Sequence, residues 1–429
     1  MSAPENLPTA DNGLLRFLTC GSVDDGKSTL IGRLLFDSKS ILADTLHAFE
    51  RTSRKRGLAG VDLSLLTDGL QAEREQGITI DVAYRYFTTG KRKYIIADAP
   101  GHEQYTRNMV TAASTADSAI ILVDARKGVL TQTRRHSTIA HLMGIPQLLV
   151  AVNKMDLVGY AQEVFERIRA EYLDFARQVG ITEVRFIPIS ALAGDMIVAR
   201  GESLGWYQGP TLLEILETTP SAHGDPAQQG ENFRFPVQYV CRPQQADDPA
   251  LHDYRGFMGR IESGEITVGD EVTHLPSRLT ARIKDIQIAG KSLPLAFAEQ
   301  SITLLLDREI DISRGDMLVN SAAPPRILQT IQAQLCWLSE TPLDHQRRYI
   351  VRHTTREAKA KLAGIDHRLN IATLAREAAS GLNMNDIAQV TFRLAQPVFA
   401  DPYAQNRATG AFIVIDESSN NTVGAGMIV

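Results

Sequence analysis

Residues 21–28 read Gly-Ser-Val-Asp-Asp-Gly-Lys-Ser and match the phosphate-loop pattern G-x-x-x-x-G-K-[ST]. Two glycines in this spacing let the backbone turn tightly enough to aim successive amides at phosphate oxygens. We expect Lys27 to reach the β- and γ-phosphates and Ser28 to hold Mg²⁺. The predicted phosphate-binding residues are Gly21, Ser22, Val23, Asp24, Asp25, Gly26, Lys27, Ser28 and Thr29.

A second candidate segment is Asp98-Ala99-Pro100-Gly101-His102, which follows the apolar run at residues 94–97. A carboxylate at the carboxyl end of a strand suits a contact to the magnesium shell, because α/β sheets bind ligands at that edge. The Gly101 amide can then donate to the γ-phosphate. The alternative is that Asp98 caps a helix that begins near His102.

Two further segments predict a base-reading site. Asn153-Lys154-Met155-Asp156 follows an apolar run at residues 148–152, and Ser190-Ala191-Leu192 follows a run at residues 185–189. An ionised Asp156 only accepts hydrogen bonds. Guanine offers two adjacent donors on one edge and adenine does not, so ATP would leave the carboxylate buried and unpaired. We expect Lys154 to stack along the base and Ser190 and Ala191 to add backbone contacts, and the predicted binding residues of this loop are Ser190, Ala191 and Leu192. These contacts favour GTP.

These segments must be carried by an alternating α/β domain. The apolar runs at residues 14–20, 94–97, 148–152 and 185–189 predict buried strands, with helices at residues 28–36 and 210–217. The alternation to about residue 216 predicts a doubly wound, mainly parallel sheet. Residues 84–88 and 94–98 flank Thr-Gly-Lys-Arg, so one edge of this sheet is expected to be antiparallel.

Short strands replace helices after a polar linker at residues 218–231. Five runs predict one small antiparallel barrel: residues 235–240, 256–261, 271–275, 281–288 and 301–306. Four more predict a second: residues 327–335, 348–351, 388–394 and 410–415. We therefore predict a GTP-binding domain at residues 1–222, a first β-barrel at 232–322 and a second at 325–429.

The connector at residues 37–79 is long enough to hold its own helices, with one expected near residues 42–56. Its basic cluster, Arg51, Arg54, Lys55 and Arg56, is interpreted as a solvated helix face. The alternative is a contact with a partner that depends on the bound nucleotide.

Composition places the chain among cytoplasmic proteins of two to three domains. It has 429 residues and a formal net charge of −5, which gives no overall attraction to nucleic acid. Its three cysteines are far apart and fit reduced, buried thiols rather than metal ligands. No signal-peptide core or membrane-spanning run is expected.

The segment Glu-Arg-Glu-Gln-Gly-Ile-Thr-Ile at residues 73–80 resembles the first switch of translation-factor-type GTPases such as elongation factor Tu. The resemblance implies that Thr79 closes on Mg²⁺ and the γ-phosphate, and that His102 positions the hydrolytic water. Residues 422–426, Thr-Val-Gly-Ala-Gly, resemble the end of the last barrel of those factors. The alternatives are a solvated helix face for the Glu/Arg cluster and a helix N-terminal position for His102. The catalytic residues implied are His102, Lys27 and Thr79, and the magnesium ligands are Ser28, Thr79 and Asp98.

Longer stretches resemble a narrower family. The phosphate loop carries Ser-Val-Asp-Asp where translation factors usually carry His-Val-Asp-His. Residues 67–87, 125–137, 234–240 and 311–316 resemble the large GTPase subunit of bacterial heterodimeric sulfate adenylyltransferase (ATP sulfurylase). The resemblance covers nearly the whole chain from about residue 14. It implies a heterodimer whose small catalytic subunit makes adenylyl sulfate and pyrophosphate from ATP and sulfate, and this chain has no second P-loop for ATP.

Two other functions use the same nucleotide motifs. A translation factor that delivers aminoacyl-tRNA would bind tRNA in a GTP-dependent way, which the acidic balance and the altered loop disfavour. A purely regulatory GTP switch would bind GTP without changing the rate of a sulfurylase subunit.

Overall fold

The computed structural model describes residues 13–39, 63, 82–101, 105–221, 232–243, 254–371 and 373–429. Thr79, His102, the expected helix at residues 42–56 and most of the expected linker lie outside these ranges. The chain divides into two compact units close to residue 223. The domain boundaries 1–222, 232–322 and 325–429 stay predictions.

The first unit is built on a six-stranded sheet in the order β2-β3-β1-β4-β5-β6. All neighbouring strands are parallel except β2, which pairs antiparallel with β3. The strands are β1 (Leu14–Gly21), β2 (Ala83–Thr88), β3 (Lys93–Asp98), β4 (Ser118–Asp124), β5 (Gln147–Asn153) and β6 (Val184–Pro188). The expected strands and the antiparallel edge are therefore present.

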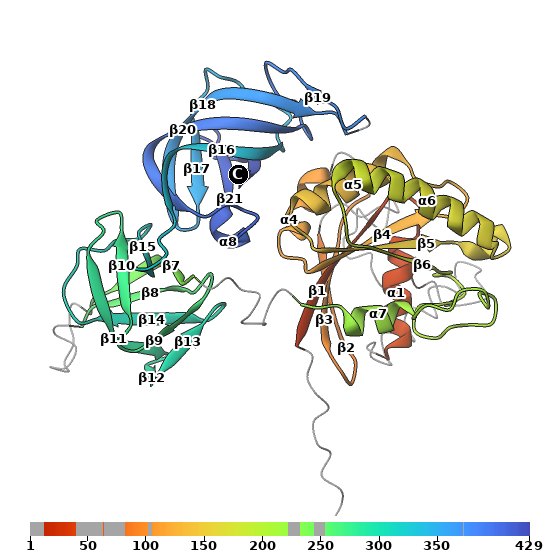
Figure 1. Ribbon diagram of the computed structural model, residues 1–429, viewed down its shortest axis with the longest axis horizontal. Helices are drawn as coiled ribbons and strands as arrows, with labels where there is room; N and C mark the ends of the chain where they lie inside the picture. The colour runs from red at the N-terminus through yellow and green to blue at the C-terminus, as the bar shows by residue number, and fades with distance from the viewer. Residues whose placement is uncertain are drawn as a thin grey trace, which may run out of the picture. The chain divides into compact units, whose positions relative to one another are not determined.

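Helices cover both faces of this sheet. In Figure 1, α4, α5 and α6 lie on one face, and α1 and α7 lie on the other. The helices are α1 (Lys27–Asp37), α4 (Thr106–Ala113), α5 (Thr131–Leu142), α6 (Gln162–Val179) and α7 (Leu212–Thr218), with a 3-10 turn, η3 (Met155–Val158). Because both faces are covered, the inner strands are continuous apolar runs, and β4 is buried along its whole length.

The first barrel closes because β10 pairs with β11 as well as with β15. Going round, its strands run β10-β15-β7-β8-β14-β11, all antiparallel. The bounds are β7 (Arg234–Cys241), β8 (Gly256–Arg260), β9 (Glu265–Thr267), β10 (Glu271–Leu275), β11 (Thr280–Ile288), β12 (Lys291–Leu293), β13 (Leu295–Phe297), β14 (Ser301–Leu306) and β15 (Met317–Asn320). The five expected strands each overlap one of these.

The second barrel closes in the same way, through the pairing of β17 with both β18 and β21. Going round, its strands run β17-β21-β22-β16-β20-β18. The bounds are β16 (Arg326–Trp337), β17 (Tyr349–His353), β18 (Arg356–Leu369), β19 (Arg376–Glu377), β20 (Ile387–Ala400), β21 (Ala411–Asp416) and β22 (Thr422–Ile428), with the short helix α8 (Arg407–Gly410) before β21. The predicted fold class, an α/β GTPase domain followed by two antiparallel barrels, is confirmed.

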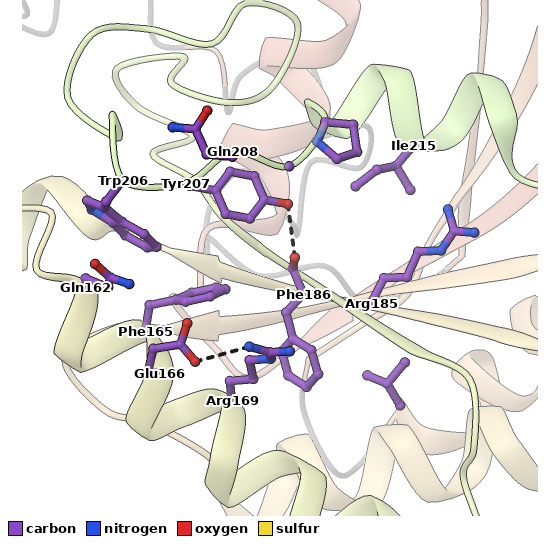
Figure 2. A pocket seen from close by; sticks show the side chains of 13 residues that line it. Gln162, Phe165, Glu166, Arg169, Arg185, Phe186, Trp206, Tyr207, Gln208 and Ile215 are labelled. Carbon is purple, nitrogen blue, oxygen red and sulfur yellow. Dashed lines mark hydrogen bonds and ion pairs between the residues drawn. The ribbon is translucent and has the colours of Figure 1, made fainter.

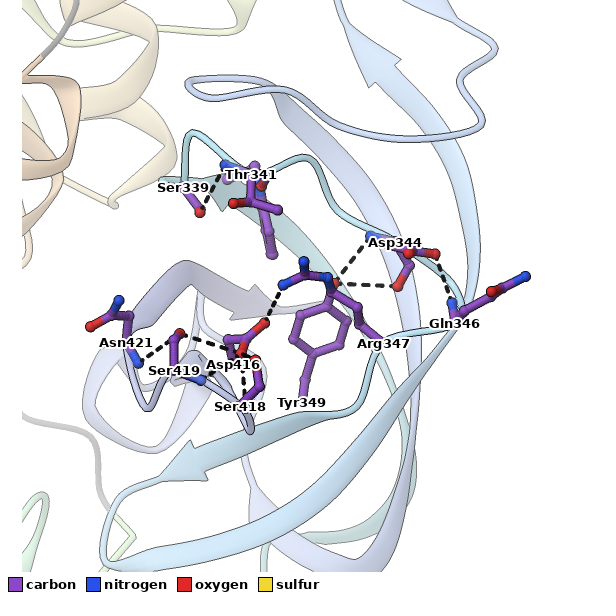
Figure 3. A network of polar contacts seen from close by, with 11 residues as sticks. Ser339, Thr341, Asp344, Gln346, Arg347, Tyr349, Asp416, Ser418, Ser419 and Asn421 are labelled. Atoms are coloured by element: carbon purple, nitrogen blue, oxygen red, sulfur yellow. Dashed lines mark hydrogen bonds and ion pairs between the residues drawn. The ribbon is translucent and has the colours of Figure 1, made fainter.

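A carboxylate organises the turn between β21 and β22. Asp416 accepts hydrogen bonds from the backbone amides of Ser418 and Ser419, each at 2.9 Å, and from Arg347 Nη1 at 2.9 Å (Figure 3). These donors, led by the Ser418 hydroxyl, hold the pKa of the Asp416 carboxyl well below its usual range although burial opposes them. The turn is thus fixed by side-chain acceptors at the end of the barrel.

The two barrels are joined by two ion pairs and an apolar contact. Arg234 of β7 donates two hydrogen bonds of 2.9 Å to the carboxylate of Asp401, which directly follows β20. Arg356 of β18 pairs with Asp316 at 3.3 Å. An apolar cluster joins residues of both barrels: Leu275, Met317, Val319, Phe399 and Ile327. The barrels therefore form one of the two units of the chain.

Within the described ranges, none of the helices has the length and hydropathy needed to cross a membrane. The three cysteines are free thiols, with Cys20 and Cys336 buried.

Candidate functional site

The phosphate loop lies between β1 and α1 and is held by its own lysine. Lys27 Nζ donates to the carbonyl oxygens of Gly21 at 3.1 Å and Ser22 at 3.3 Å, and the residue is 8% exposed. The ammonium group is therefore buried inside the loop, where a positive charge faces any anion that the loop encloses. This is the position that the expected phosphate contact requires.

Gly26 ends the loop in a conformation that favours glycine. Its φ is +92°, and a Cβ built on it would lie 2.5 Å from Asn153 Nδ2. The same amide nitrogen donates to the Asp25 carbonyl at 2.8 Å. The glycine thus permits the base-side segment to contact the phosphate loop directly.

Asp25 places a carboxylate beneath this loop. It is 1% exposed, and its Oδ2 accepts the Ser22 amide at 2.6 Å. Within the described part of the chain, Oδ1 has no hydrogen-bond partner. Burial raises the pKa of the Asp25 carboxyl above its ordinary value, although the Ser22 amide and the charge of Lys27 oppose this shift.

The segment after β3 passes against the phosphate loop. A Cβ built on Gly101 would lie 2.6 Å from Lys27 Nζ and 2.8 Å from the Gly21 carbonyl oxygen. Asp98 is 2% exposed at the end of β3 and accepts the Thr19 hydroxyl at 3.2 Å. Residues 98–101 therefore lie directly against residues 21–27. The first described residues of the next helix, α4, begin at Thr106, so the alternative of a helix cap near His102 lies outside the described residues.

The base side is assembled from β5 and β6. Asn153 Oδ1 accepts the Ala191 amide at 2.9 Å, so this side chain bridges the phosphate loop and the loop after β6. The Ser190 hydroxyl donates to Asp156 Oδ1 at 2.7 Å. Asp156 is thereby held with a second oxygen that can accept further donors.

Lys154 reaches across the site to the phosphate loop. It has a left-handed φ of 63°, and its Nζ bonds to the Asp24 carbonyl and lies 3.0 Å from Asp124 Oδ2. Arg126 also donates to Asp124, at 2.6 and 3.0 Å. Although burial favours the neutral acid, these donors, Arg126 first, hold the pKa of the Asp124 carboxyl well below its usual range.

Asp124 and Arg33 are site residues that the motifs missed. Asp124 ends β4, between the strands that carry the phosphate and base motifs, so its place at the carboxyl edge of the sheet is a usable signal. Arg33 lies within α1 and donates to the carbonyls of Ala191 and Leu192. No motif marks Arg33, because its role depends on a contact between residues 158 positions apart.

The described site residues thus come together from four loops at the carboxyl edge of the sheet. Val23 and Thr29 lie in the same loop and helix start as Lys27, and Ala99 is buried beside Asp98. Pro100 is buried and Leu192 is largely exposed. Two predicted residues, Thr79 and His102, lie outside the described ranges.

A separate cavity of about 570 Å³ lies beside the edge strand β6 and contains none of the predicted site residues. Figure 2 shows Phe165, Trp206 and Tyr207 around it, with Arg169 and Glu166 paired at 3.2 Å on α6. The Tyr207 hydroxyl donates to the Phe186 carbonyl at 3.2 Å. The Tyr207 hydroxyl thus uses a carbonyl of the edge strand that points away from the sheet, so another strand cannot pair with it there.

Two family models match the chain. Residues 12–221 match the elongation factor Tu GTP binding domain, and residues 330–429 match the GTP-eEF1A C-terminal domain-like family. The first match covers the six-stranded sheet and every predicted site residue.

Curated proteins match over almost the whole chain. Sulfate adenylyltransferase subunit 1 of Cellvibrio japonicus is 54% identical over 97% of this chain and 86% of its own length. The same subunit of Alteromonas mediterranea is 52% identical over 97% and 87%. The bifunctional enzyme NodQ of Rhizobium sp. is 53% identical over 97% of this chain and 63% of its own length. A solved structure of sup35 complexed with GDP is 22% identical, with a TM-score of 0.42 over 99% of this chain and 95% of that one.

Proposed function

Because the chain belongs to the sulfate adenylyltransferase subunit 1 family, we propose that it hydrolyses GTP to drive the formation of adenylyl sulfate by a partner subunit. The predicted family is confirmed, as is the prediction of an enzyme subunit with a translation-factor-type GTP-binding domain. The relatives favour this function over the delivery of aminoacyl-tRNA. The observation that carries the proposal is the junction of Lys27, Gly101 and Asn153 around one loop.

In this proposal the phosphate loop holds the β- and γ-phosphates through Lys27 and its backbone amides. Asp156 accepts hydrogen bonds from the two donors of guanine, and the hydrogen bond from the Ser190 hydroxyl holds its carboxylate in place. Lys154, held between Asp24 and Asp124, covers the base. Contacts among the described side chains support each of these roles.

Mg²⁺ fits the oxygen atoms at this site. Ser28 contributes a hydroxyl at the start of α1, and Asp98 contributes a buried carboxylate at the end of β3. Such hard oxygen donors suit Mg²⁺, which also keeps water and phosphate ligands. When bound, the ion neutralises phosphate charge. Thr79 is proposed as the ligand that joins only when a γ-phosphate is present.

His102 is proposed to orient the hydrolytic water, since in the sequence it directly follows Gly101, and Gly101 lies against the phosphate loop. His102→Ala should spare nucleotide binding and slow hydrolysis by about 10²-fold or more, as expected for a positioned catalytic group. Equal losses of binding and rate would instead assign His102 a structural role.

Coupling to GTP has a thermodynamic reason. Adenylyl transfer from ATP to sulfate releases pyrophosphate and forms a high-energy mixed anhydride, so the reaction lies far toward ATP. Hydrolysis of GTP can supply the missing driving force. The partner is proposed to be the small catalytic subunit, in a cytoplasmic heterodimer, and the free thiols fit that compartment.

The test is pyrophosphate release from ATP and sulfate by the pair reconstituted with the small subunit. We expect GTP, and not GDP, to raise the rate. Thr79→Ala should leave GDP affinity nearly unchanged, slow GTP hydrolysis and remove the stimulation. A wild-type pair without any GTP stimulation would contradict the proposal and leave GTP-dependent tRNA binding as the function to measure.

A further inference from the structure

Among residues 190–194, which follow β6, one backbone amide is free to meet a base. The Ala191 amide donates to Asn153 Oδ1 at 2.9 Å, and the Ala193 amide donates to the Ser190 hydroxyl at 3.2 Å. Between them, the Leu192 amide makes no hydrogen bond to any residue in the described part of the chain. The expected backbone contact to guanine therefore falls on Leu192 rather than on Ala191.

The guanidinium of Arg33 holds the carbonyls of this loop from the side of α1. Arg33 Nε donates to the Ala191 carbonyl at 3.3 Å, and Nη2 donates to the Leu192 carbonyl at 2.6 Å. Asp37, one turn further along α1, lies 3.7 Å from Nη1. The Arg33 side chain is only 20% exposed. Its planar guanidinium group is held by the loop carbonyls on one side and by Asp37 on the other.

Because of the geometry of the peptide group, this contact also sets the direction of the Leu192 amide. The Ala191 carbonyl and the Leu192 amide belong to one planar trans peptide, so they point in opposite directions. Holding the carbonyl toward α1 therefore points the amide away from α1. A cation on the carbonyl also polarises the peptide and strengthens its N–H as a donor.

We propose that Arg33 is a positioning residue for base recognition, which aims the Leu192 amide at the 6-oxo group of guanine. This inference rests on the proposed function. Since α1 begins at Lys27, the helix also sets the spacing from the phosphate loop to the base loop, about 9 Å along its axis for six residues. Arg33 thus connects the two halves of the nucleotide site through one rigid element.

The test compares GDP with 6-thioguanosine diphosphate, which keeps every donor and phosphate of GDP but replaces the 6-oxo oxygen with sulfur, a weak acceptor. Dissociation constants are measured for wild type, Arg33→Ala and Arg33→Lys. We expect wild type to prefer GDP, and Arg33→Ala to reduce this preference about 3- to 10-fold, the worth of one aligned hydrogen bond. Arg33→Lys, which can hold one carbonyl, should lie between them. Arg177→Ala is the matched control, because Arg177 is exposed and bonds only to residues of its own helix, and its preference should equal that of wild type.

An equal loss of affinity for both ligands in Arg33→Ala would overturn the inference. It would show that Arg33 supports the fold of the site but does not direct the Leu192 amide toward the 6-position of the base. So would a wild type that does not distinguish GDP from the thio analogue. If Arg33→Ala does not fold in thermal unfolding, the Arg33→Lys preference decides between the same two results. Failure of the proposed function is distinguishable: the reconstituted wild-type pair would then show no stimulation of pyrophosphate release by GTP, whatever the nucleotide preference of Arg33→Ala.

Discussion

Asp25 is a buried carboxylate where the proposed phosphates must lie. Lys27 and Lys127 favour its ionised form, whereas burial and Asp124 favour the neutral acid, and burial is the largest of these effects. Because the pKa is raised in the folded state, the folded protein holds this proton at pH values where the unfolded chain has lost it. Asp25 therefore lowers the free energy of unfolding as the pH rises above the ordinary carboxyl value of 3.8.

We predict that Asp25→Asn gains stability over wild type as the pH increases from about 4 toward neutrality. The gain should grow by at most about 1.4 kcal/mol per pH unit, the limit for one proton, and then level off above the raised pKa. Urea unfolding at a series of pH values measures it, with Asp24→Asn, exposed in the same loop, as the control. A stability difference that does not change with pH would contradict the prediction.

Gly101 lies where the structure leaves no space for a side chain. A Cβ there would lie under 3 Å from both Lys27 Nζ and the Gly21 carbonyl oxygen. Overpacking of this kind typically costs 1–3 kcal/mol. We predict that Gly101→Ala weakens GTP binding about 5- to 150-fold. GDP binding should weaken less, because Gly101 is proposed to face the γ-phosphate.

Equilibrium binding of both nucleotides checks this prediction. Gly205→Ala is the matched control, since a Cβ at Gly205 meets nothing within 4 Å, and its affinities should equal those of wild type. Unchanged GTP affinity in Gly101→Ala would show that residues 98–101 do not contact the triphosphate.

At the scale of elements, strands with continuous apolar sequences could be predicted, and strands without a clear apolar pattern could not. The apolar runs of β1, β3, β5 and β6 predicted these four strands, and the polar segments that follow them lie at one edge of the sheet. By contrast, β18 was missed, because its inward residues are Ala358, Ala360 and Leu362 and its outward ones are Glu357, Lys359 and Lys361. Alanine, glutamate and lysine favour helices, so the alternation carries little strand signal.

Two further elements show where local pattern fails. The strand β20 was expected to end at residue 394, but it continues across Pro397 to Ala400. Its partner β16 shifts register between Leu328 and Thr330, and a proline is tolerated in a strand at such an irregularity. Pairing across the barrel, rather than local propensity, decides this boundary.

The joint between the barrels gives a prediction at this scale. Arg234 is 2% exposed and Asp401 is 13% exposed, so removal of one charge leaves the other buried without its partner. We predict that Arg234→Ala lowers the free energy of unfolding of the barrel unit by about 3–5 kcal/mol.

Urea unfolding measures this loss, and Arg352→Ala is the matched control. Arg352 and Glu357 form a pair at about half exposure on the same unit, so that variant should lose only about 0–1 kcal/mol. Equal losses in the two variants would contradict the role of the buried pair.

At the scale of the whole molecule, the proposed function couples a guanine-nucleotide switch in the first unit to chemistry on a partner subunit. The parts of the site that sequence identified are the motif residues, whose spacing is fixed by phosphate and base geometry. Asp124 and Arg33 were not identified, because they act through contacts that arise only when distant segments fold together.

The most direct test asks whether this chain's own base-reading residue controls the coupled reaction. Asp156→Asn should no longer accept the two guanine donors, but it can accept and donate to xanthine, which carries a carbonyl in place of the amino group. The measurement is pyrophosphate release from ATP and sulfate by the reconstituted pair, with GTP or xanthosine triphosphate. The account predicts stimulation of the wild-type pair by GTP alone, and of the Asp156→Asn pair by xanthosine triphosphate at least about tenfold more effectively than by GTP. A variant pair that still responds to GTP as wild type does, with no gain from xanthosine triphosphate, would contradict it.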